Sequence, residues 1–186
     1  WKAIGVEQKI IDELLIKDRQ IQLTDQRKFL EIVKISCFLD IEKSIRLADK
    51  ISHRHACAEA WINIACYSND TLYYNRALRA IDDCVNPYLQ WQYLERIMPH
   101  LKPIQSLEVI RIIRDIKQDY FRVAALVTLA CRFSEFRFEA KTAVLALSSE
   151  VAKIEQLSRL AVEMPELLPE IISILERINS SEKRDS

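Results

Sequence analysis

The sequence predicts an all-α protein, a right-handed α-solenoid of antiparallel helix pairs with roughly 10–11 helices. Composition is the first reason, because one Gly and five Pro in 186 residues leave few breaks, and 49% of the residues are hydrophobic. Such a composition favours continuous helix and argues against sheet. The second reason is that apolar residues recur at helical spacing. The third is a repeat of about 31–34 residues that holds two helices.

The clearest copy of the repeat spans residues 112–131. Ile112, Ile113 and Ile116 share one helical face, and a second helix follows after a short turn. Asp119 lies in that turn, where we expect its carboxylate to accept hydrogen bonds from the free amide groups of the next helix. The second helix carries its apolar face on Ala125, Leu126, Leu129 and Ala130.

Weaker copies of this unit lie before and after it. The aligned residues, here called the anchor positions, are Ile51, Cys84, Ile116 and Leu147. They are 33, 32 and 31 residues apart. At the position of Leu126 the other copies have Trp61, Leu94 and Leu157. A fainter copy precedes them, with Ile16 at its anchor position.

The shared pattern is Ala-x-x-Ile, a turn with Asp and Tyr, an Arg, and then Ala-Leu-x-x-Leu-Ala. It resembles the degenerate tetratricopeptide-like repeats of many bacterial multidomain proteins, and the resemblance covers residues 40–162. This sequence departs from the family near the end of the first helix, where a small residue, often Gly, is usual. The residues found there are Ala48, Ile81, Ile113 and Val144. The resemblance implies a module that binds other proteins.

Start and stop signals place the helices of the N-terminal half. The first helix is expected over residues 6–16, where apolar side chains form one stripe. Thr24 is expected to cap the second helix. The third helix is expected over residues 40–51, the fourth after Arg54, and the fifth over residues 71–84.

The later helices are placed by proline and by capping residues. Asn86 and Pro87 predict the start of the sixth helix, because Asn caps helices and Pro is tolerated in the first turn. Pro99 and Pro103 predict its end, because each lacks an amide hydrogen and disfavours helix before it. The next helices are expected to begin near Ser106, Asp119, Ser134 and Ser148, and the last is expected over residues 166–178.

A chain of this length can bury a substantial core as one domain. We expect a single helical repeat domain over residues 1–178. Within it, residues 1–39 form a degenerate N-terminal helix pair, residues 40–162 form the repeats, and residues 163–178 form a capping helix. Residues 179–186 are polar and are predicted to form a flexible tail.

Charge and hydropathy exclude some partners. The chain has 27 basic and 27 acidic residues, so its formal net charge is zero and no nucleic-acid partner is expected. We expect no membrane span, because no apolar run reaches the roughly 18 residues that a spanning helix needs. The first residues do not resemble a signal peptide. Since the chain does not begin with Met, we expect it to be a fragment or a processed chain.

Side chains suited to chemistry are few. The five cysteines have no metal-type spacing. Cys66 and Cys131 share one repeat position and are predicted to be small buried packing residues, and unpaired thiols suit a reducing cytoplasm. His53, His55 and Cys57 form the only cluster of metal-binding types, but zinc needs three or four converging ligands, so an ordinary solvated turn is expected. With one glycine, the usual phosphate-binding loop is excluded. We therefore predict no catalytic residue, no metal site and no cofactor.

A row of basic residues is the main candidate binding site. Arg46, Arg79 and Arg111 occupy equivalent repeat positions, and Lys43 and Arg76 lie one helical turn earlier. Stacked repeats would align these side chains, and the planar fork of Arg suits carboxylates, which predicts a groove for an acidic or C-terminal peptide. The alternative is a solvated face with local ion pairs. The acids available for such pairs are Glu42, Asp49, Asp82 and Asp115.

Two aromatic residues are further candidates. Tyr73 and Trp91 lie in the middle repeat, and the equivalents of Trp91 in the other repeats are not aromatic. Aromatic side chains are favoured anchors in interfaces, although plain packing is the alternative.

These observations predict a non-enzymatic interaction module or scaffold that holds a protein or peptide in a solenoid groove, and the basic row favours an acidic partner. Two alternatives remain open at this point. The first is a regulatory or sensor repeat domain of a larger multidomain enzyme, and the second is a chaperone of the secretion type.

Overall fold

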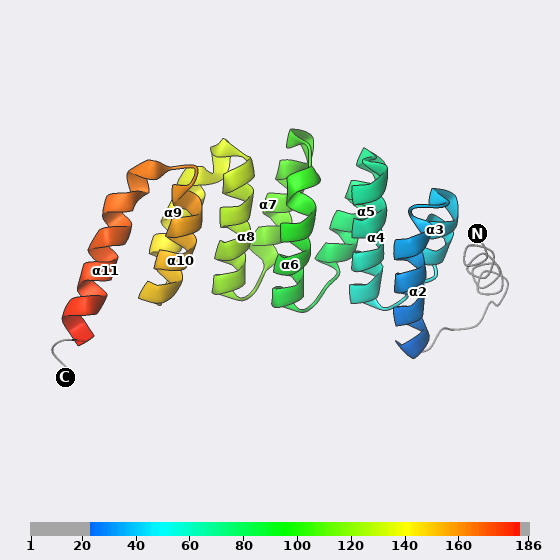
Figure 1. Cartoon of the computed structure of the whole chain (residues 1–186), viewed down its shortest axis with the longest axis horizontal. Coiled ribbons are helices and arrows are strands. Elements are labelled where there is room, and N and C mark those ends of the chain that lie inside the picture. The colour runs from blue at the N-terminus through cyan, green and yellow to red at the C-terminus, as the bar shows by residue number, and fades with distance from the viewer. Residues whose placement is uncertain (1–22, 183–186) are drawn as a thin grey trace. The chain divides into compact units, whose positions relative to one another are not determined.

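The structure is a computed structural model that describes residues 23–182, and this part of the chain is helical throughout, without a strand (Figure 1). It contains ten α-helices, labelled α2 to α11, and four short 3-10 helices, η1 to η4. The predicted all-α class is therefore confirmed. The helix predicted over residues 6–16 lies outside the described residues. Each helix from residue 23 to residue 182 is too short or too polar to cross a membrane.

The chain divides into two compact units, Trp1–Leu89 and Gln90–Ser186, and the division falls inside α6. The helices described in the first unit are α2 (Leu23–Ser36), α3 (Ile41–Ala48), α4 (Arg54–Ser68), α5 (Thr71–Asp82) and the first turn of α6. Here α2 packs on both α3 and α4, and α4 also packs on α3 and α5. Helix α2 thus contacts the next helix along the chain and the one after it.

The second unit shows the same kind of contact. Its α-helices are the rest of α6 (Pro87–Ile97), α7 (Ser106–Asp115), α8 (Asp119–Arg132), α9 (Arg137–Leu145), α10 (Glu150–Ala161) and α11 (Leu168–Glu182). The 3-10 helices are η1 (Met98–His100), η2 (Pro103–Gln105), η3 (Ser134–Phe136) and η4 (Pro165–Leu167). Helix α8 packs on α7, α9 and α10, and α10 packs on α9 and α11 (Figure 1).

The predicted repeat positions lie in the core of each unit. All four anchor positions are buried, as are the residues equivalent to Leu126. Burial of one large apolar side chain contributes about 1.5–3 kcal/mol before entropy is counted. Isolated helices shorter than about 12–15 residues are marginal in water, so these contacts are what keep each helix formed.

Side-chain caps fix several helix starts. Asp40 accepts a backbone hydrogen bond at 3.1 Å before α3, and Asp70 accepts one at 2.8 Å before α5. Asn86 does the same at 3.0 Å before α6, and Ser149 at 3.3 Å before α10. Helix α4 ends at Asn69, whose φ of 54° lies in the left-handed region that Asn tolerates better than most residues.

Some predicted boundaries are wrong. Helices α3 and α5 end at Ala48 and Asp82, before the predicted ends at 51 and 84, because the following amides bond three residues back in a tighter turn. Helix α8 has Gln118 at its cap position, without a side-chain hydrogen bond. The carboxylate of Asp119 instead contacts the guanidinium of Arg122 one turn ahead, so the predicted cap is replaced by an ion pair.

Two further boundaries differ at the ends of the described chain. Helix α2 begins at Leu23, so Thr24 lies inside the helix rather than before it. The last predicted helix begins as the 3-10 turn η4, continues as α11 from Leu168, and extends through Glu182, beyond the expected end at 178.

Candidate partner-binding site

The first unit contains a hollow of about 380 Å³ between the end of α3, the start of α4 and the end of α5. Its charged and aromatic lining is Asp49, Arg54, Trp61, Arg76, Arg79 and Asp83. We call it the arginine pocket. Two of the predicted site residues, Arg76 and Arg79, meet here because they lie one helical turn apart on the same face of α5.

Arg76 is held in place from two sides. Its guanidinium carbon lies 4.8 Å from the centre of the Trp61 ring, a cation–π contact, and its Nη1 lies 3.3 Å from Asp49 Oδ1. Tyr73, another predicted site residue, also contacts Trp61, with ring centres 6.3 Å apart and planes within 17° of parallel. Arg76 therefore presents its remaining donors from a restrained position.

Arg79 and Arg54 are less engaged. Arg79 is exposed, and within the part of the chain that the structure describes its side chain makes no hydrogen bond or ion pair. Arg54 donates from Nη1 to the backbone carbonyl of Asp83 at 3.4 Å, which leaves its charge without a carboxylate partner in that contact. The arginine pocket thus offers guanidinium donors to an incoming acceptor.

The titratable groups beside these arginines are suited to packing. Burial raises the pKa of the Cys57 thiol, and the charges of Asp49 and Asp83 raise it further, so the thiol stays protonated near neutral pH. Burial also raises the pKa of Cys84, to about 12, and its Sγ contacts the carbonyl of Ala80 at 3.3 Å. Neither thiol has the low pKa of a nucleophile.

The histidine turn before α4 is also described. Burial lowers the pKa of His55, and the charges of His53 and Arg54 lower it further. The two imidazole rings lie edge to face, with centres 5.4 Å apart. No group of three or more His, Cys, Asp or Glu side chains among residues 23–182 is arranged to hold a metal ion.

The other predicted basic residues do not line the arginine pocket. Lys43 on α3 has its Nζ 4.0 Å from Oδ2 of Asp40, the cap residue before this helix, and Arg46 is exposed on α3. Arg111, in the second unit, forms ion pairs on its own helix with Glu108 at 2.8 Å and with Asp115 at 3.6 Å. Local pairing, the alternative to the basic row, therefore applies to Arg111.

Trp91 lies in the second unit and packs against its neighbours. Its ring stacks on Phe121 at 5.5 Å with planes within 18° of parallel, and Tyr120 meets Phe121 edge to face at 5.4 Å. The side chain is half-buried, so these contacts already use much of its surface.

Sequence reasoning missed Arg54 and Asp83 and treated Trp61 as a core residue only. Trp61 is indeed buried, with 5% of its surface exposed, yet its ring also carries Arg76. A signal was present, because the other copies have leucine at this repeat position. Arg54 had no comparable signal, since its place in the pocket depends on how α4 meets α5.

A second hollow, of about 330 Å³, lies at the corresponding place in the second unit, between α8, α9 and α10. Its arginine, Arg122, contacts Asp119 and donates to the carbonyl of Ile116 at 3.1 Å. The positions equivalent to Arg76 and Arg79 are occupied by Glu139 and Thr142. The basic character of the arginine pocket is therefore not a general property of the repeat.

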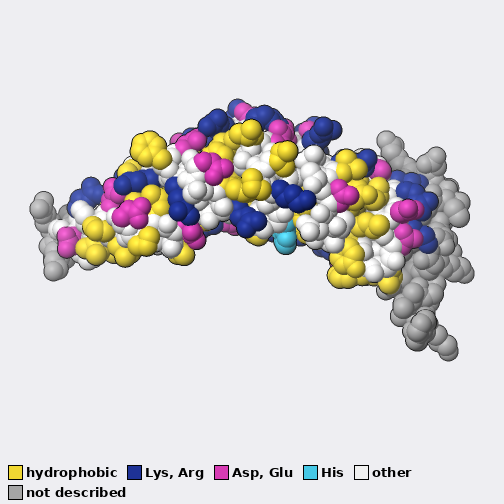
Figure 2. All heavy atoms as spheres, turned by 90° about the horizontal axis from the view of Figure 1, so that it is seen from above, with side chains coloured by type: hydrophobic (Ala, Val, Ile, Leu, Met, Phe, Trp, Pro, Cys, Tyr) yellow, Lys and Arg dark blue, Asp and Glu magenta, His cyan; other side chains and the backbone are white. Residues whose placement is uncertain are grey.

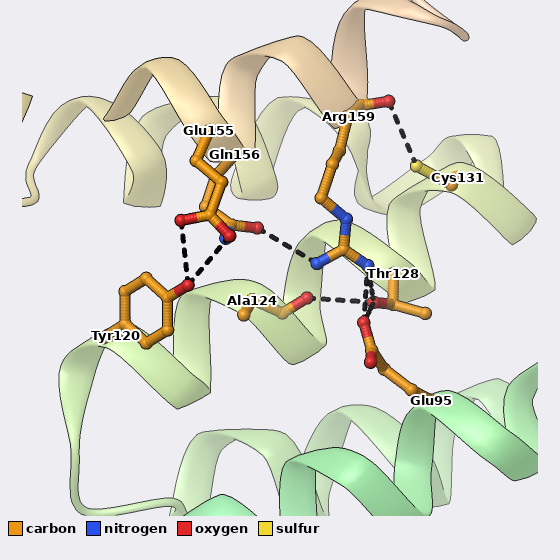
Figure 3. Close-up of polar contacts among 8 residues, drawn as sticks. All are labelled: Glu95, Tyr120, Ala124, Thr128, Cys131, Glu155, Gln156 and Arg159. Carbon is orange, nitrogen blue, oxygen red and sulfur yellow. Dashed lines mark hydrogen bonds and ion pairs between the residues drawn. The ribbon is translucent and has the colours of Figure 1, made fainter. Parts of the chain in front are cut away.

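A polar network joins α6, α8 and α10 in the second unit (Figure 3). The Nη2 of Arg159 lies 2.6 Å from Glu95 Oε1 and 2.9 Å from Thr128 Oγ1, and its Nη1 donates to Gln156 Oε1 at 3.3 Å. Tyr120 donates its hydroxyl to Glu155 nearby, at 3.0 Å. Because the guanidinium is engaged by three side chains, we interpret this network as a structural connection between helices.

Surface charge is mixed. On the face drawn in Figure 2, Lys and Arg side chains are interspersed with Asp and Glu, as the zero formal charge suggests. That face is unlike the continuous basic surface typical of nucleic-acid binding.

Comparison with known proteins gives no relative: no family model matches this chain, and no curated protein or solved structure is significantly similar to it. The tetratricopeptide-like resemblance therefore rests on the sequence pattern alone.

Proposed function

We propose that this protein is a non-enzymatic interaction module, a right-handed solenoid of tetratricopeptide-like helix pairs that binds a protein or peptide partner. The contacts of alternate helices support the architecture, since α2 packs on α4 and α8 packs on α10. Stacked helix pairs make this kind of contact, in which each unit buries the apolar face of its neighbour. The burial of all four anchor positions agrees with it.

The main observation behind the binding proposal is that the charge of Arg79 has no partner among the described residues. It lines a hollow beside Arg76, and it makes no ion pair within the described residues. Binding sites are concave and combine an apolar wall with a few polar groups that fix orientation. The arginine pocket has both, because Ile51, Trp61 and Ala80 supply the apolar part of its wall.

The chemistry of the arginine pocket supports binding rather than catalysis. The raised pKa of Cys57 keeps the thiol protonated, and a nucleophile would need the opposite shift. A location in a reducing cytoplasm is part of the proposal, supported by five cysteines that are not in disulfides.

The test is a partner capture from native cell extract, comparing the wild type with Arg79→Glu and Arg46→Glu. Arg46 is the matched control, since it is exposed at the equivalent position of α3 but lies outside the arginine pocket. We expect the wild type and Arg46→Glu to retain a partner that Arg79→Glu loses. Equal thermal denaturation of the three forms shows that folding is intact. A partner held equally by all three forms, or by none, contradicts the proposal.

A further inference from the structure

We propose that the arginine pocket recognises one acidic side chain, an Asp or Glu of a protein partner, that stands beside an apolar residue. This proposal rests on the proposed function and names the chemistry of the group that is bound. The carboxylate takes the free donors of Arg79 and Arg54, and the neighbouring apolar side chain lies at the apolar part of the lining beside them.

The net charge of the arginine pocket indicates how many acidic groups it can bind. Three arginines and two aspartates line the arginine pocket, an excess of one positive charge. Asp49 and Arg76 neutralise each other at 3.3 Å, so the excess resides with Arg54 and Arg79 against Asp83. One carboxylate balances it, whereas a phosphate monoester, at about −1.5 to −2, brings more negative charge than the arginine pocket has to offset.

The hydrogen-bond donors of the arginine pocket favour an acidic side chain of the partner over its C-terminal carboxylate. Chain-terminal carboxylates are commonly captured by nests of backbone amides, whereas acidic side chains in motifs are bound by clusters of arginines. Arg76 and Arg79 lie within α5, where backbone amides are used by the helix itself, so the donors that these two residues offer are their guanidinium forks. Such forks match a carboxylate with two parallel hydrogen bonds.

The apolar neighbour follows from the rest of the lining. Ile51, Trp61 and Ala80 are buried, with 6%, 5% and 9% of their surfaces exposed. The atoms by which they line the hollow beside the arginines are apolar and offer no hydrogen-bond partner, so they favour an apolar side chain next to the bound carboxylate. An acidic residue with an apolar neighbour therefore fits the arginine pocket better than a run of acidic residues does.

The second unit provides an internal comparison. At the corresponding hollow Arg122 contacts Asp119, and Glu139 replaces the equivalent of Arg76. The arginine of that hollow is already paired with a carboxylate, unlike Arg79, so we expect no binding of an acidic ligand there.

The experiment is an NMR titration of the whole chain at low salt, because salt screens exposed charges. The probe is the capped dipeptide acetyl-Glu-Leu-amide, and the signals followed are the Trp61 indole and the Arg79 Nε–H. Matched probes are acetyl-Gln-Leu-amide, acetyl-Gln-Leu with a free carboxyl end, and acetyl-phosphoserine-Leu-amide. Matched proteins are Arg79→Gln and the control Arg46→Gln.

We expect saturable shifts with the Glu probe, about tenfold weaker binding in Arg79→Gln, and no change in Arg46→Gln. The Gln probe and the free-ended probe should also bind about tenfold more weakly. Equal binding of the Glu and Gln probes, stronger binding of the free-ended or phosphoserine probe, or no binding at all overturns the proposal. If the titration fails but a partner is still captured from extract in an Arg79-dependent manner, the proposed interaction module is supported and only the acidic ligand is refuted.

Discussion

Arg159 on α10 donates a hydrogen bond from Nη2 to Glu95 Oε1 on α6 at 2.6 Å, although the two residues are 64 positions apart in the chain. Thr128 on α8 lies between them and hydrogen bonds to both, at 2.9 Å to Arg159 and 3.2 Å to Glu95. The contact joins three helices of the second unit through side chains that are about one-third exposed.

Removal of the Glu95 carboxylate should destabilise the second unit. Glu95→Ala leaves Arg159 and Thr128 without their shared acceptor, and we expect the free energy of unfolding to fall by about 1–2 kcal/mol. Glu95→Gln keeps an uncharged acceptor and should cost less. Chemical denaturation of the two variants checks this. Equal losses for Ala and Gln would contradict the expected contribution of a neutral acceptor, and no loss for either variant would show that the contact does not stabilise the unit.

One ion pair occurs twice with its charges exchanged. Asp49 and Arg76 lie 3.3 Å apart in the first unit, and the equivalent positions hold Arg114 and Glu139, 3.1 Å apart, in the second. The positions correspond because each is the same distance from its anchor position in the repeat. The repeat therefore accommodates this ion pair whichever of the two positions carries the acidic residue.

Charge exchange in the second pair should therefore be tolerated. Arg114→Glu alone opposes Glu139 and should cost about 0.5–1 kcal/mol, because exposed pairs contribute little. Arg114→Glu combined with Glu139→Arg should restore most of that loss. A double-mutant cycle measured by denaturation at low and high salt tests it; a double variant no more stable than the single one would refute the equivalence.

The sequence was sufficient to predict the helical class, most helix starts and the buried anchor positions, because each depends on local spacing and capping. Asp40 and Asn86 illustrate this, since each caps the helix that follows it. The contact between Glu95 and Arg159 could not be predicted, because it depends on how three helices pack. The same holds for Arg54, which enters the arginine pocket from a different helix than Arg79.

The basic row was predicted from repeat positions, but equivalent positions do not ensure equivalent surroundings. Arg79 lines a hollow, whereas Arg111 has acidic residues one turn away on both sides of it along α7 and pairs with them. Those acids are visible in the sequence at spacings of three and four, which favour ion pairs on a helix. Local helical neighbours therefore decided the outcome for Arg111.

Truncation of a core leucine should distinguish the core from the surface. Leu94 is fully buried in α6, and Leu94→Ala should cost about 2–5 kcal/mol because it leaves a cavity. Leu107 on α7 is 74% exposed, so Leu107→Ala should be nearly neutral. Urea denaturation of both variants tests the assignment, and a near-neutral Leu94→Ala would refute it.

The buried thiol of Cys84 should make stability depend on pH in the alkaline range. Burial raises its pKa in the folded protein from 9.0 to about 12, so the folded state holds the proton more tightly than the unfolded state. The resulting stabilisation is full below pH 9 and is lost as pH rises from 9 towards 12. Other groups also titrate in this pH range, so the effect of Cys84 must be measured as a difference between two proteins.

That difference is between the wild type and Cys84→Ala, which removes the titrating group. We expect the free energy of unfolding of the wild type to fall more steeply between pH 9 and pH 11 than that of Cys84→Ala. The reason is that unfolding releases a proton from Cys84 in the wild type alone. The measurement is chemical denaturation under reducing conditions. If the free energies of unfolding of the two proteins fall in parallel with pH, burial does not raise the pKa of the Cys84 thiol.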